Sequence, residues 1–310
     1  MASNLIVKLS SRIDLGLKPS PLIQLSNMND FYVKVDSQNT TTINFGGSKL
    51  RKIEYLLGSL MKDHGINEIT SFGAFGSFHL KTMSYWCKHL GIKFHVKVWK
   101  QPWHIQEGRN FIITRNLSSS VRWMPSFLSL IYQGAVWKKE KTHAIVPVGG
   151  EKQSGAYSFS QAMLELDEQT DLTNSIIFVA TGTCATVSGL YLGACKLKKN
   201  ITIIASNIVS KYIPVKSRII NIAKNTNNLY DLDLDFTKAK LVCKYAGETW
   251  KLIDYGVVQS DYKELNWLAQ SNGFKIDPTY TGKTFRSALN YYNSNSNNLN
   301  GPVIFWNTCP

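Results

Sequence analysis

The sequence has few cysteines, and they form no pair. Five are scattered over 310 residues, with no CxxC spacing among them. An odd, dispersed set argues against a disulfide framework and against a cysteine zinc site. Because such usage is typical of a reducing compartment, we expect a cytoplasmic protein. The five are Cys87, Cys184, Cys195, Cys243 and Cys309.

Metal-binding and membrane signals are missing as well. The six histidines show no HExxH pairing, so we predict no metal site. The apolar run near the N-terminus is too short for a signal peptide, and no other stretch reaches the length that spans a bilayer. We therefore expect no membrane association.

Acidic residues are scarce. The chain has 21 of them against 35 lysines and arginines, which gives a formal net charge of +14. Such a charge suits an anionic partner, and a nucleic-acid binder is one interpretation. The lysines are dispersed, however, and cluster locally only at 138–141 and 196–199. We therefore favour a solvated basic surface and expect no nucleic-acid partner.

What the sequence does contain is an alternation of strands and helices. Short apolar, β-branched runs are each followed by a run with helical periodicity, a pattern that predicts an α/β protein with parallel open sheets covered by helices. At this length we expect two lobes. The predicted strands are 31–36, 66–72, 93–99, 120–124, 145–148, 175–180, 201–206 and 302–306. The predicted helices are 48–63, 78–90, 108–116, 155–166, 187–197, 215–225, 264–272 and 282–292.

One lysine lies where the local electrostatics disfavour it. Gly46-Gly47-Ser48-Lys49 precedes an apolar stripe with helical spacing, so Ser48 is the predicted N-cap and Lys49 the first helical residue. A cation at a helix N-terminus opposes the macrodipole, and its pKa could be lowered enough for a nucleophile or Schiff-base former. The alternative is a surface lysine, and the local sequence alone favours that alternative.

Three predicted strands end in small-residue turns that lead into helices. In parallel sheets ligands bind beyond such strand ends. The turn at 181–186 contains three threonines and can aim several backbone N–H groups at a phosphate. It matches neither GxxxxGK[ST] nor GxGxxG, so neither nucleotide motif is met. A phosphate site together with a reactive lysine indicates pyridoxal 5′-phosphate, which needs both.

The order of the motifs resembles the fold-type II, or tryptophan synthase β-like, pyridoxal-phosphate enzymes. The closest branch is the one that contains 1-aminocyclopropane-1-carboxylate (ACC) deaminase and D-cysteine desulfhydrase. The match spans nearly the whole chain. The motifs that carry it are Pro19–Leu22, Val33–Asp36, Gly46–Leu56, Phe72–His79, Pro147–Gly150, Ala180–Thr186, Asp254–Gly256, Asp277–Lys283 and Asn307–Thr308.

The resemblance implies a role for each matching residue. Lys49 would form the Schiff base and move the substrate Cα proton, and Lys52 would lie near the phosphate. Ser77 would contact the substrate carboxylate or the reacting group. Tyr255 and Tyr280 would face the substrate, with Tyr280 as an acid/base or a nucleophile; packing is the alternative for both tyrosines. The phosphate would be held by Thr181, Gly182, Thr183, Cys184, Ala185 and Thr186, and the pyridine nitrogen approached by Thr281 and Thr308.

The same resemblance implies the domain division and the partners. We expect a small lobe at 47–154 and a large cofactor-binding lobe made of 1–46 and 155–310, with the cofactor between them. The expected partners are a small amino-acid substrate and a second copy of the chain in a homodimer.

The residue after the second tyrosine separates the two activities of this branch. The deaminase has an acidic residue there, whereas this sequence has Thr281, as the desulfhydrase does. The resemblance therefore favours β-elimination from D-cysteine to pyruvate, ammonia and sulfide. ACC deamination to 2-oxobutyrate and ammonia is the alternative.

The sequence also departs from the family pattern. Phe78 replaces an asparagine expected to bond the cofactor's 3′-oxygen, a contact worth about 1–2 kcal/mol. Cys184 and Ala185 stand where glycines are usual in the phosphate loop, which restricts the backbone angles there. These departures favour a further alternative, a non-catalytic relative that keeps the fold.

Overall fold

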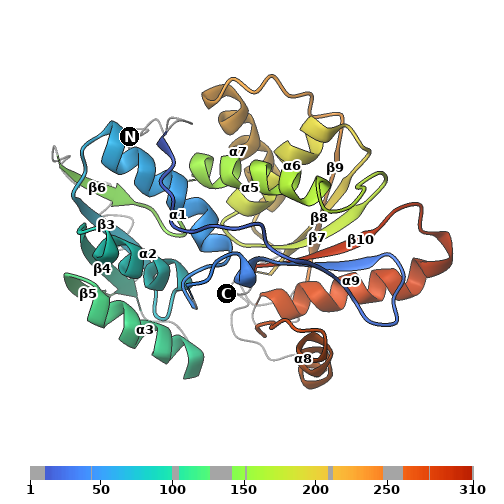
Figure 1. Ribbon diagram of the computed structural model, residues 1–310, viewed down its shortest axis with the longest axis horizontal. Helices are drawn as coiled ribbons and strands as arrows, with labels where there is room; N and C mark the ends of the chain where they lie inside the picture. Colours follow the sequence, from blue (N-terminus) through green and yellow to red (C-terminus); the bar gives the residue numbers. More distant parts are fainter. Residues whose placement is uncertain are drawn as a thin grey trace. The chain divides into compact units, whose positions relative to one another are not determined.

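Two separate β-sheets organise the chain in the computed structural model (Figure 1). The structure describes residues 11–42, 44–99, 105–125, 142–150, 152–208, 212–246, 261–278 and 280–308. The chain divides into two units around these sheets. Unit 1 is Met1–Leu15 with Lys49–Gly155, and unit 2 is Gly16–Ser48 with Ala156–Pro310.

Unit 1 contains a four-stranded parallel sheet in the order β5-β4-β3-β6. β3 lies between β4 and β6, and its residues 69–73 are all buried. The strands are β3 (Glu68–Ala74), β4 (Lys93–Trp99), β5 (Ser120–Met124) and β6 (His143–Val146). The helices are α1 (Ser48–Gly58), continued by a π-helical turn (Ser59–Asp63), α2 (Phe78–His89) and α3 (Ile105–Leu117).

Unit 2 contains a six-stranded sheet in the order β1-β2-β10-β7-β8-β9. Only the β1–β2 pair is antiparallel. The strands are β1 (Leu22–Gln24), β2 (Phe31–Val35), β7 (Ile176–Thr181), β8 (Thr202–Asn207), β9 (Lys240–Tyr245) and β10 (Val303–Asn307). The helices are α5 (Lys152–Asp167), α6 (Ala185–Leu197), α7 (Val215–Leu229), α8 (Tyr262–Ser271) and α9 (Thr281–Asn295).

Alternate residues of these strands face two different cores, as the pleat requires. Val179 and Trp306 pack with α5, α6 and α7 on one face of the sheet. Phe178 and Phe305 pack with α8 and α9 on the other (Figure 1). The predicted α/β architecture with parallel sheets covered by helices is therefore confirmed.

Residues 11–15 differ from the predicted division, because they group with unit 1 rather than with the large lobe. Gly58 of α1 allows the approach: a Cβ there would lie 1.7 Å from the carbonyl oxygen of Ser11. The buried carboxylate of Glu54 then receives Arg12 Nε at 2.7 Å and the backbone N–H of Leu15 at 3.0 Å. These contacts fix residues 11–15 on α1.

Close packing between α5 and α6 supports the loop that precedes α6. A Cβ on Gly189 would lie 2.1 Å from the carbonyl oxygen of Ala156 and 2.5 Å from Cβ of Phe159. One turn later, a Cβ on Gly193 would lie 2.4 Å from Cβ of Met163. The two glycines therefore let the two helix backbones approach closely.

Replacing Gly189 with alanine is expected to lower the free energy of unfolding by about 2–3 kcal/mol, since the added methyl group overpacks a rigid contact. Urea denaturation followed by circular dichroism measures the loss. Lys196→Ala, on the exposed side of the same helix, is the control and should stay within about 0.5 kcal/mol of the wild type. An equal stability of Gly189→Ala and wild type would contradict the close packing.

Candidate active site

The start of α1 is fixed by Asn39. Its side-chain oxygen accepts the N–H of Gly47 at 2.9 Å, and its amide donates to the carbonyl of Gly47 at 3.2 Å. Ser48 is already helical, and its hydroxyl donates to the carbonyl of Thr308 at 3.4 Å. The prediction of Ser48 as the N-cap is therefore wrong, because this hydroxyl bonds to a distant carbonyl and not to its own helix.

Lys49 follows directly and lies in unit 1. Its side chain keeps some exposed surface, yet surrounding protein atoms desolvate the ammonium and lower the pKa of Lys49 below its ordinary value. Lys52, one turn further along the same helix face, is buried. The helix thus presents two cationic side chains near its N-terminus, where the macrodipole adds a further penalty to their charge.

His79 is a neutral imidazole close to these lysines. Burial first, and then the positive charges of Lys49 and Lys52, lower the pKa of His79 to about 3. The hydroxyl of Ser71 donates to the carbonyl of Val146 at 3.0 Å and lies 3.2 Å from Nε2 of His79. Since a serine has one proton, Nε2 of His79 carries the hydrogen between the two side chains. The Nδ1 atom is therefore the unprotonated one.

This histidine is expected to make unit 1 sensitive to acid. In the unfolded chain His79 takes up a proton near pH 6.5, whereas in the folded protein it does so only near pH 3. Its contribution to stability is therefore complete above about pH 6.5 and is lost as the pH falls toward 3. Urea unfolding at several pH values between about 4 and 7 should show a shallower pH slope for His79→Gln than for wild type.

His89→Gln serves as the matched control, because it removes an exposed imidazole from the same helix. It should keep the wild-type slope. A His79→Gln protein with an unchanged slope would refute the assignment of a buried neutral imidazole.

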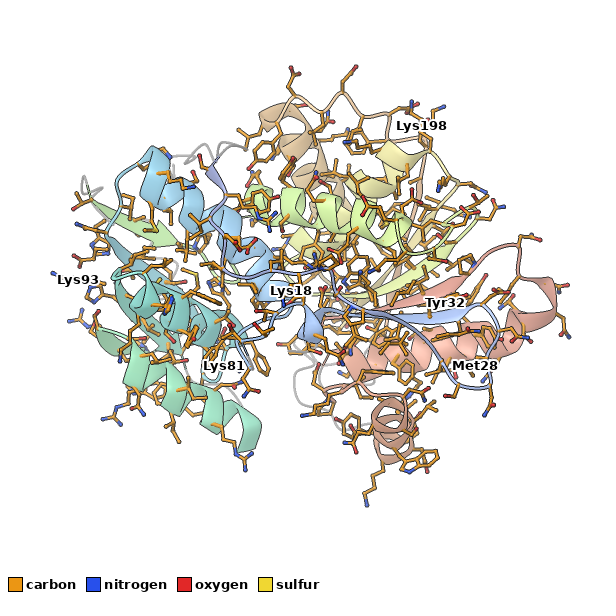
Figure 2. The ribbon with its side chains drawn as sticks, in the orientation of Figure 1. Lys18, Met28, Tyr32, Lys81, Lys93 and Lys198 are labelled. Atoms are coloured by element: carbon orange, nitrogen blue, oxygen red, sulfur yellow. The ribbon has the colours of Figure 1, made fainter. Side chains whose placement is uncertain are left out.

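Ser77 and Phe78 begin α2. Ser77 is the N-cap, and its hydroxyl oxygen accepts the N–H of Leu80 at 3.5 Å, which leaves the hydroxyl hydrogen for another acceptor. The ring of Phe78 is half-buried and makes a cation–π contact with the ammonium of Lys81, which lies 4.9 Å from the ring centroid. Lys81 extends from the same helix (Figure 2) and is itself buried. An aromatic ring in contact with a cation thus occupies the position where the resemblance implied an asparagine.

The predicted phosphate loop lies in unit 2, between β7 and α6. The hydroxyl of Thr181 is buried at the end of β7 and has no hydrogen-bond partner among the described residues. Thr183 is exposed and Thr186 is half-buried, and the first-turn N–H groups of α6 begin at Ala185. A buried hydroxyl without a partner beside a helix N-terminus fits a bound phosphate.

Cys184 adopts a left-handed conformation in this loop, with φ +73°. The backbone there has the form that a glycine takes easily, although the residue is a cysteine. Cys184 is buried against the unit 2 core, and its carbonyl accepts the N–H of Ser188 at 3.0 Å. The loop therefore keeps the turn despite the substitution at the usual glycine position.

The remaining predicted residues of unit 2 lie at the ends of two elements. Tyr280 precedes α9 with its side chain partly exposed, and Thr281 is the first, buried residue of α9. Thr308 follows β10, the strand beside β7, and is half-buried. Tyr255 lies outside the described residues.

The structure thus groups the predicted residues within each unit. Unit 1 brings together Lys49 and Lys52 with His79, which has no predicted role of its own in the sequence. Unit 2 places Thr181 and Thr308 at the same end of neighbouring parallel strands. It also adds Asp277, whose carboxylate bonds to Tyr280 and Thr281. An Asp-Pro pair just before a helix is the sequence signal that could have indicated this role.

The described residues contain neither a metal-binding cluster nor a membrane-spanning helix. No group of three or more His, Cys, Asp or Glu side chains is arranged there to hold a metal ion. Within those same residues, no helix has both the length and the apolar character needed to cross a bilayer.

Comparison with known proteins gives relatives over nearly the full length. A candidate ACC deaminase from Thermotoga maritima is 26% identical over 303 residues, which cover 93% of this chain and 94% of that protein. The D-cysteine desulfhydrase of Serratia proteamaculans is 26% identical over 317 residues, which cover 96% of this chain and 93% of that protein. No protein-family model matches the chain.

Solved structures show the same fold. The crystal structure of an ACC deaminase homologue superimposes with a TM-score of 0.79 at 24% identity, covering 98% of this chain and 93% of that one. A hydrogen sulfide-producing enzyme from Fusobacterium nucleatum superimposes with a TM-score of 0.64 at 15% identity, covering 99% of this chain and 97% of that one. The resemblance to fold-type II enzymes, which also include serine racemase, is therefore confirmed.

Proposed function

This chain is a relative, over nearly its full length, of D-cysteine desulfhydrases and ACC deaminases, and from that premise we propose that it is a pyridoxal-phosphate-dependent lyase. The first candidate reaction converts D-cysteine to pyruvate, ammonia and hydrogen sulfide. The observation that carries the proposal is Lys49, whose pKa is lowered at the start of α1. A lysine must be uncharged to bond to the aldehyde of the cofactor, and burial favours that form.

The phosphate of the cofactor would be held in unit 2. The buried hydroxyl of Thr181 and the first N–H groups of α6 are suited to bind it. We also propose Lys52 as a residue near the phosphate and Thr308 as one near the pyridine nitrogen. Gly182, Thr183, Cys184, Ala185 and Thr186 complete the proposed phosphate loop.

The proton transfers would fall to two side chains. When bound, the cofactor withdraws electrons from the substrate Cα and so eases loss of its proton. Lys49 would accept that proton, and the phenol of Tyr280 would give a proton to the sulfur as the Cβ–S bond breaks. The sulfur leaves with the bonding electron pair as sulfide, and water then releases ammonia and pyruvate. Ser77 would hold the substrate carboxylate.

Thr281 favours elimination over ring opening. Position 281 offers no carboxylate that would keep a proton on the pyridine nitrogen, so the bound cofactor would withdraw less charge from the substrate. Prompt loss of a β-leaving group suits that situation. ACC deamination, with 2-oxobutyrate as product, is the second candidate, because the Thermotoga maritima and Pyrococcus furiosus relatives carry that name.

A non-catalytic relative that keeps the fold is the third candidate. Phe78, with its ring under the ammonium of Lys81, and the left-handed Cys184 are the observations in its favour. Cofactor absorbance without turnover of any D- or L-amino acid would support this candidate over the other two.

We further propose that the protein works as a homodimer in the cytoplasm, without a nucleic-acid partner. The dispersed basic surface is in keeping with this. Lys93 in unit 1 and Lys198 in unit 2 are both exposed (Figure 2). Four cysteines of the described residues are free thiols, as a reducing compartment would leave them.

The test is reconstitution of the purified protein with pyridoxal 5′-phosphate, followed by substrate assays. A visible absorbance band that stays with the protein through gel filtration, with pyruvate and sulfide formed from D-cysteine, is the expected result. 2-Oxobutyrate from ACC would favour the second candidate. No retained absorbance would overturn the proposal.

A further inference from the structure

The carboxylate of Asp277 accepts hydrogen bonds from the backbone N–H groups of Tyr280 and Thr281. Its Oδ1 accepts the N–H of Tyr280 at 2.6 Å. Its Oδ2 accepts the hydroxyl of Thr281 at 2.6 Å and the N–H of Thr281 at 3.2 Å. In return, the N–H of Asp277 donates to Oγ1 of Thr281 at 2.8 Å. We call these two residues the Asp277–Thr281 clamp.

The clamp satisfies groups that a helix start leaves without partners. The first N–H groups of a helix have no acceptor within the helix, and a carboxylate there is favoured by the macrodipole. Asp277 supplies acceptors for Tyr280 and Thr281, and its carbonyl accepts the N–H of Gly282 at 2.8 Å. The path of the chain into α9 is therefore set by one acidic residue.

Helix α8 also contacts the chain segment 276–282 that leads into α9. The hydroxyl of Tyr262 donates to the carbonyl of Ile276 at 2.9 Å. A Cβ on Gly282 would lie 3.3 Å from the Tyr262 ring and 2.9 Å from the carbonyl oxygen of Asp277. The segment 276–282 is thus fixed both by hydrogen bonds and by close packing.

The single hydrogen of the Thr281 hydroxyl is already used in this arrangement. It has one hydrogen, which goes to Asp277, and it accepts the Asp277 N–H at the same time. Its side chain is almost completely buried. Thr281 therefore has no hydrogen left to donate to a cofactor nitrogen while the clamp is closed.

From this geometry we propose that Asp277 is a positioning residue for Tyr280, and that Thr281 acts through the clamp and not through contact with the cofactor. The role of Tyr280 in this inference rests on the proposed function. A proton donor must lie within hydrogen-bond reach of the reacting atom, and a displacement of about 1 Å can cost on the order of 100-fold in rate. The backbone of Tyr280 is held against such a displacement.

The test compares Asp277→Asn and Thr281→Val with Thr281→Ser. Asparagine keeps one carbonyl oxygen, but its amide group cannot accept the N–H and O–H of Thr281. We expect kcat for D-cysteine to fall about 10- to 100-fold in Asp277→Asn and in Thr281→Val, with KM and cofactor affinity changed less than about threefold. Thr281→Ser keeps the hydroxyl and should retain most of the activity.

Amide hydrogen exchange is the second readout, because it does not depend on turnover. The Tyr280 and Thr281 amides should exchange faster in Asp277→Asn than in wild type. The matched control is Asp235→Asn, which breaks another Asp–Thr pair, where Asp235 accepts the Thr237 N–H at 2.9 Å and the Thr237 hydroxyl at 2.7 Å. That control should leave kcat and the exchange of residues 280–281 unchanged.

Each outcome bears on the inference. Faster exchange at 280–281 with a wild-type kcat would overturn the positioning role, and equal losses of kcat in Asp277→Asn and Asp235→Asn would do the same. A Thr281→Val protein that loses cofactor absorbance at an unchanged rate of exchange would show direct contact and overturn the clamp. Wild-type protein that binds no cofactor overturns the proposed function separately, and the exchange comparison still decides whether the clamp exists.

Discussion

Lys49→Ala is expected to lose turnover by a factor on the order of 10⁴ or more, together with the retained visible absorbance of the cofactor. In the proposed reaction one amine both bonds to the cofactor and moves the Cα proton, so alanine removes both functions at once. Absorbance after gel filtration and the rate of pyruvate release from D-cysteine measure the two losses.

Two controls separate chemistry from charge. Lys49→Arg keeps a cation at the start of α1 without a reactive primary amine and should be as inactive as alanine. Lys62→Ala removes an exposed lysine whose ammonium donates to the carbonyl of Arg12, and it should keep full activity. Turnover of Lys49→Ala within tenfold of wild type would exclude Lys49 as the proton acceptor.

The same lysine sets the expected pH dependence of cofactor uptake. Burial lowers the pKa of Lys49 from the ordinary 10.5, so the free amine of the apoprotein loses its charge at a lower pH than a surface lysine does. The rate at which the apoprotein takes up pyridoxal 5′-phosphate, followed by absorbance, should therefore reach its plateau below pH 10.5.

The largest expected effect on stability comes from Lys34→Ala. Lys34 is fully buried in β2, and its ammonium donates to Glu165 at 2.6 Å, to Gln169 at 2.6 Å and to the carbonyl of Ser20 at 2.7 Å. Removing the cation takes away the ammonium that pairs with the carboxylate of Glu165, which has little exposed surface. We expect the free energy of unfolding to fall by about 3–5 kcal/mol, measured by urea denaturation.

A double variant tests the cause of that loss. Lys34→Met combined with Glu165→Gln removes both charges, so it should recover a large part of the stability that Lys34→Ala loses. Lys198→Ala, at an exposed position of unit 2, is the control for lysine removal. A loss below about 1 kcal/mol in Lys34→Ala would mean that the buried ion pair contributes no more than a surface pair.

Buried strands were predictable from the sequence, whereas the edges of the unit 2 sheet were not. β7 and β10 are continuous apolar runs because both their faces are covered, and their predicted positions are shifted by only one residue. β1 and β9 were missed. Both lie at the edges of the sheet, and β9 is defined by pairing with β8, as in Leu241 with Ile203, more than by its own pattern.

In the candidate site, too, features set by short stretches of sequence were predictable, whereas features set by partners distant in sequence were not. The motifs indicated Lys49 and the loop at 181–186 because both depend on short stretches of sequence. Ser48 was assigned wrongly as an N-cap, since its hydroxyl partner is the carbonyl of Thr308, at the other end of the described chain. The tautomer of His79 likewise depends on Ser71 and Val146, which no local pattern connects.

The position of β10 has a consequence for synthesis of the chain. β10 lies between β2 and β7, with Val303 opposite both Phe31 and Ile176, so the sheet of unit 2 is divided until this strand is in place. During translation β2 emerges before the strands of unit 1, and β10 emerges only after β7, β8 and β9. The growing chain must therefore carry an open β2 edge while unit 1 is being made, which is the kind of exposed edge that chaperones protect from aggregation.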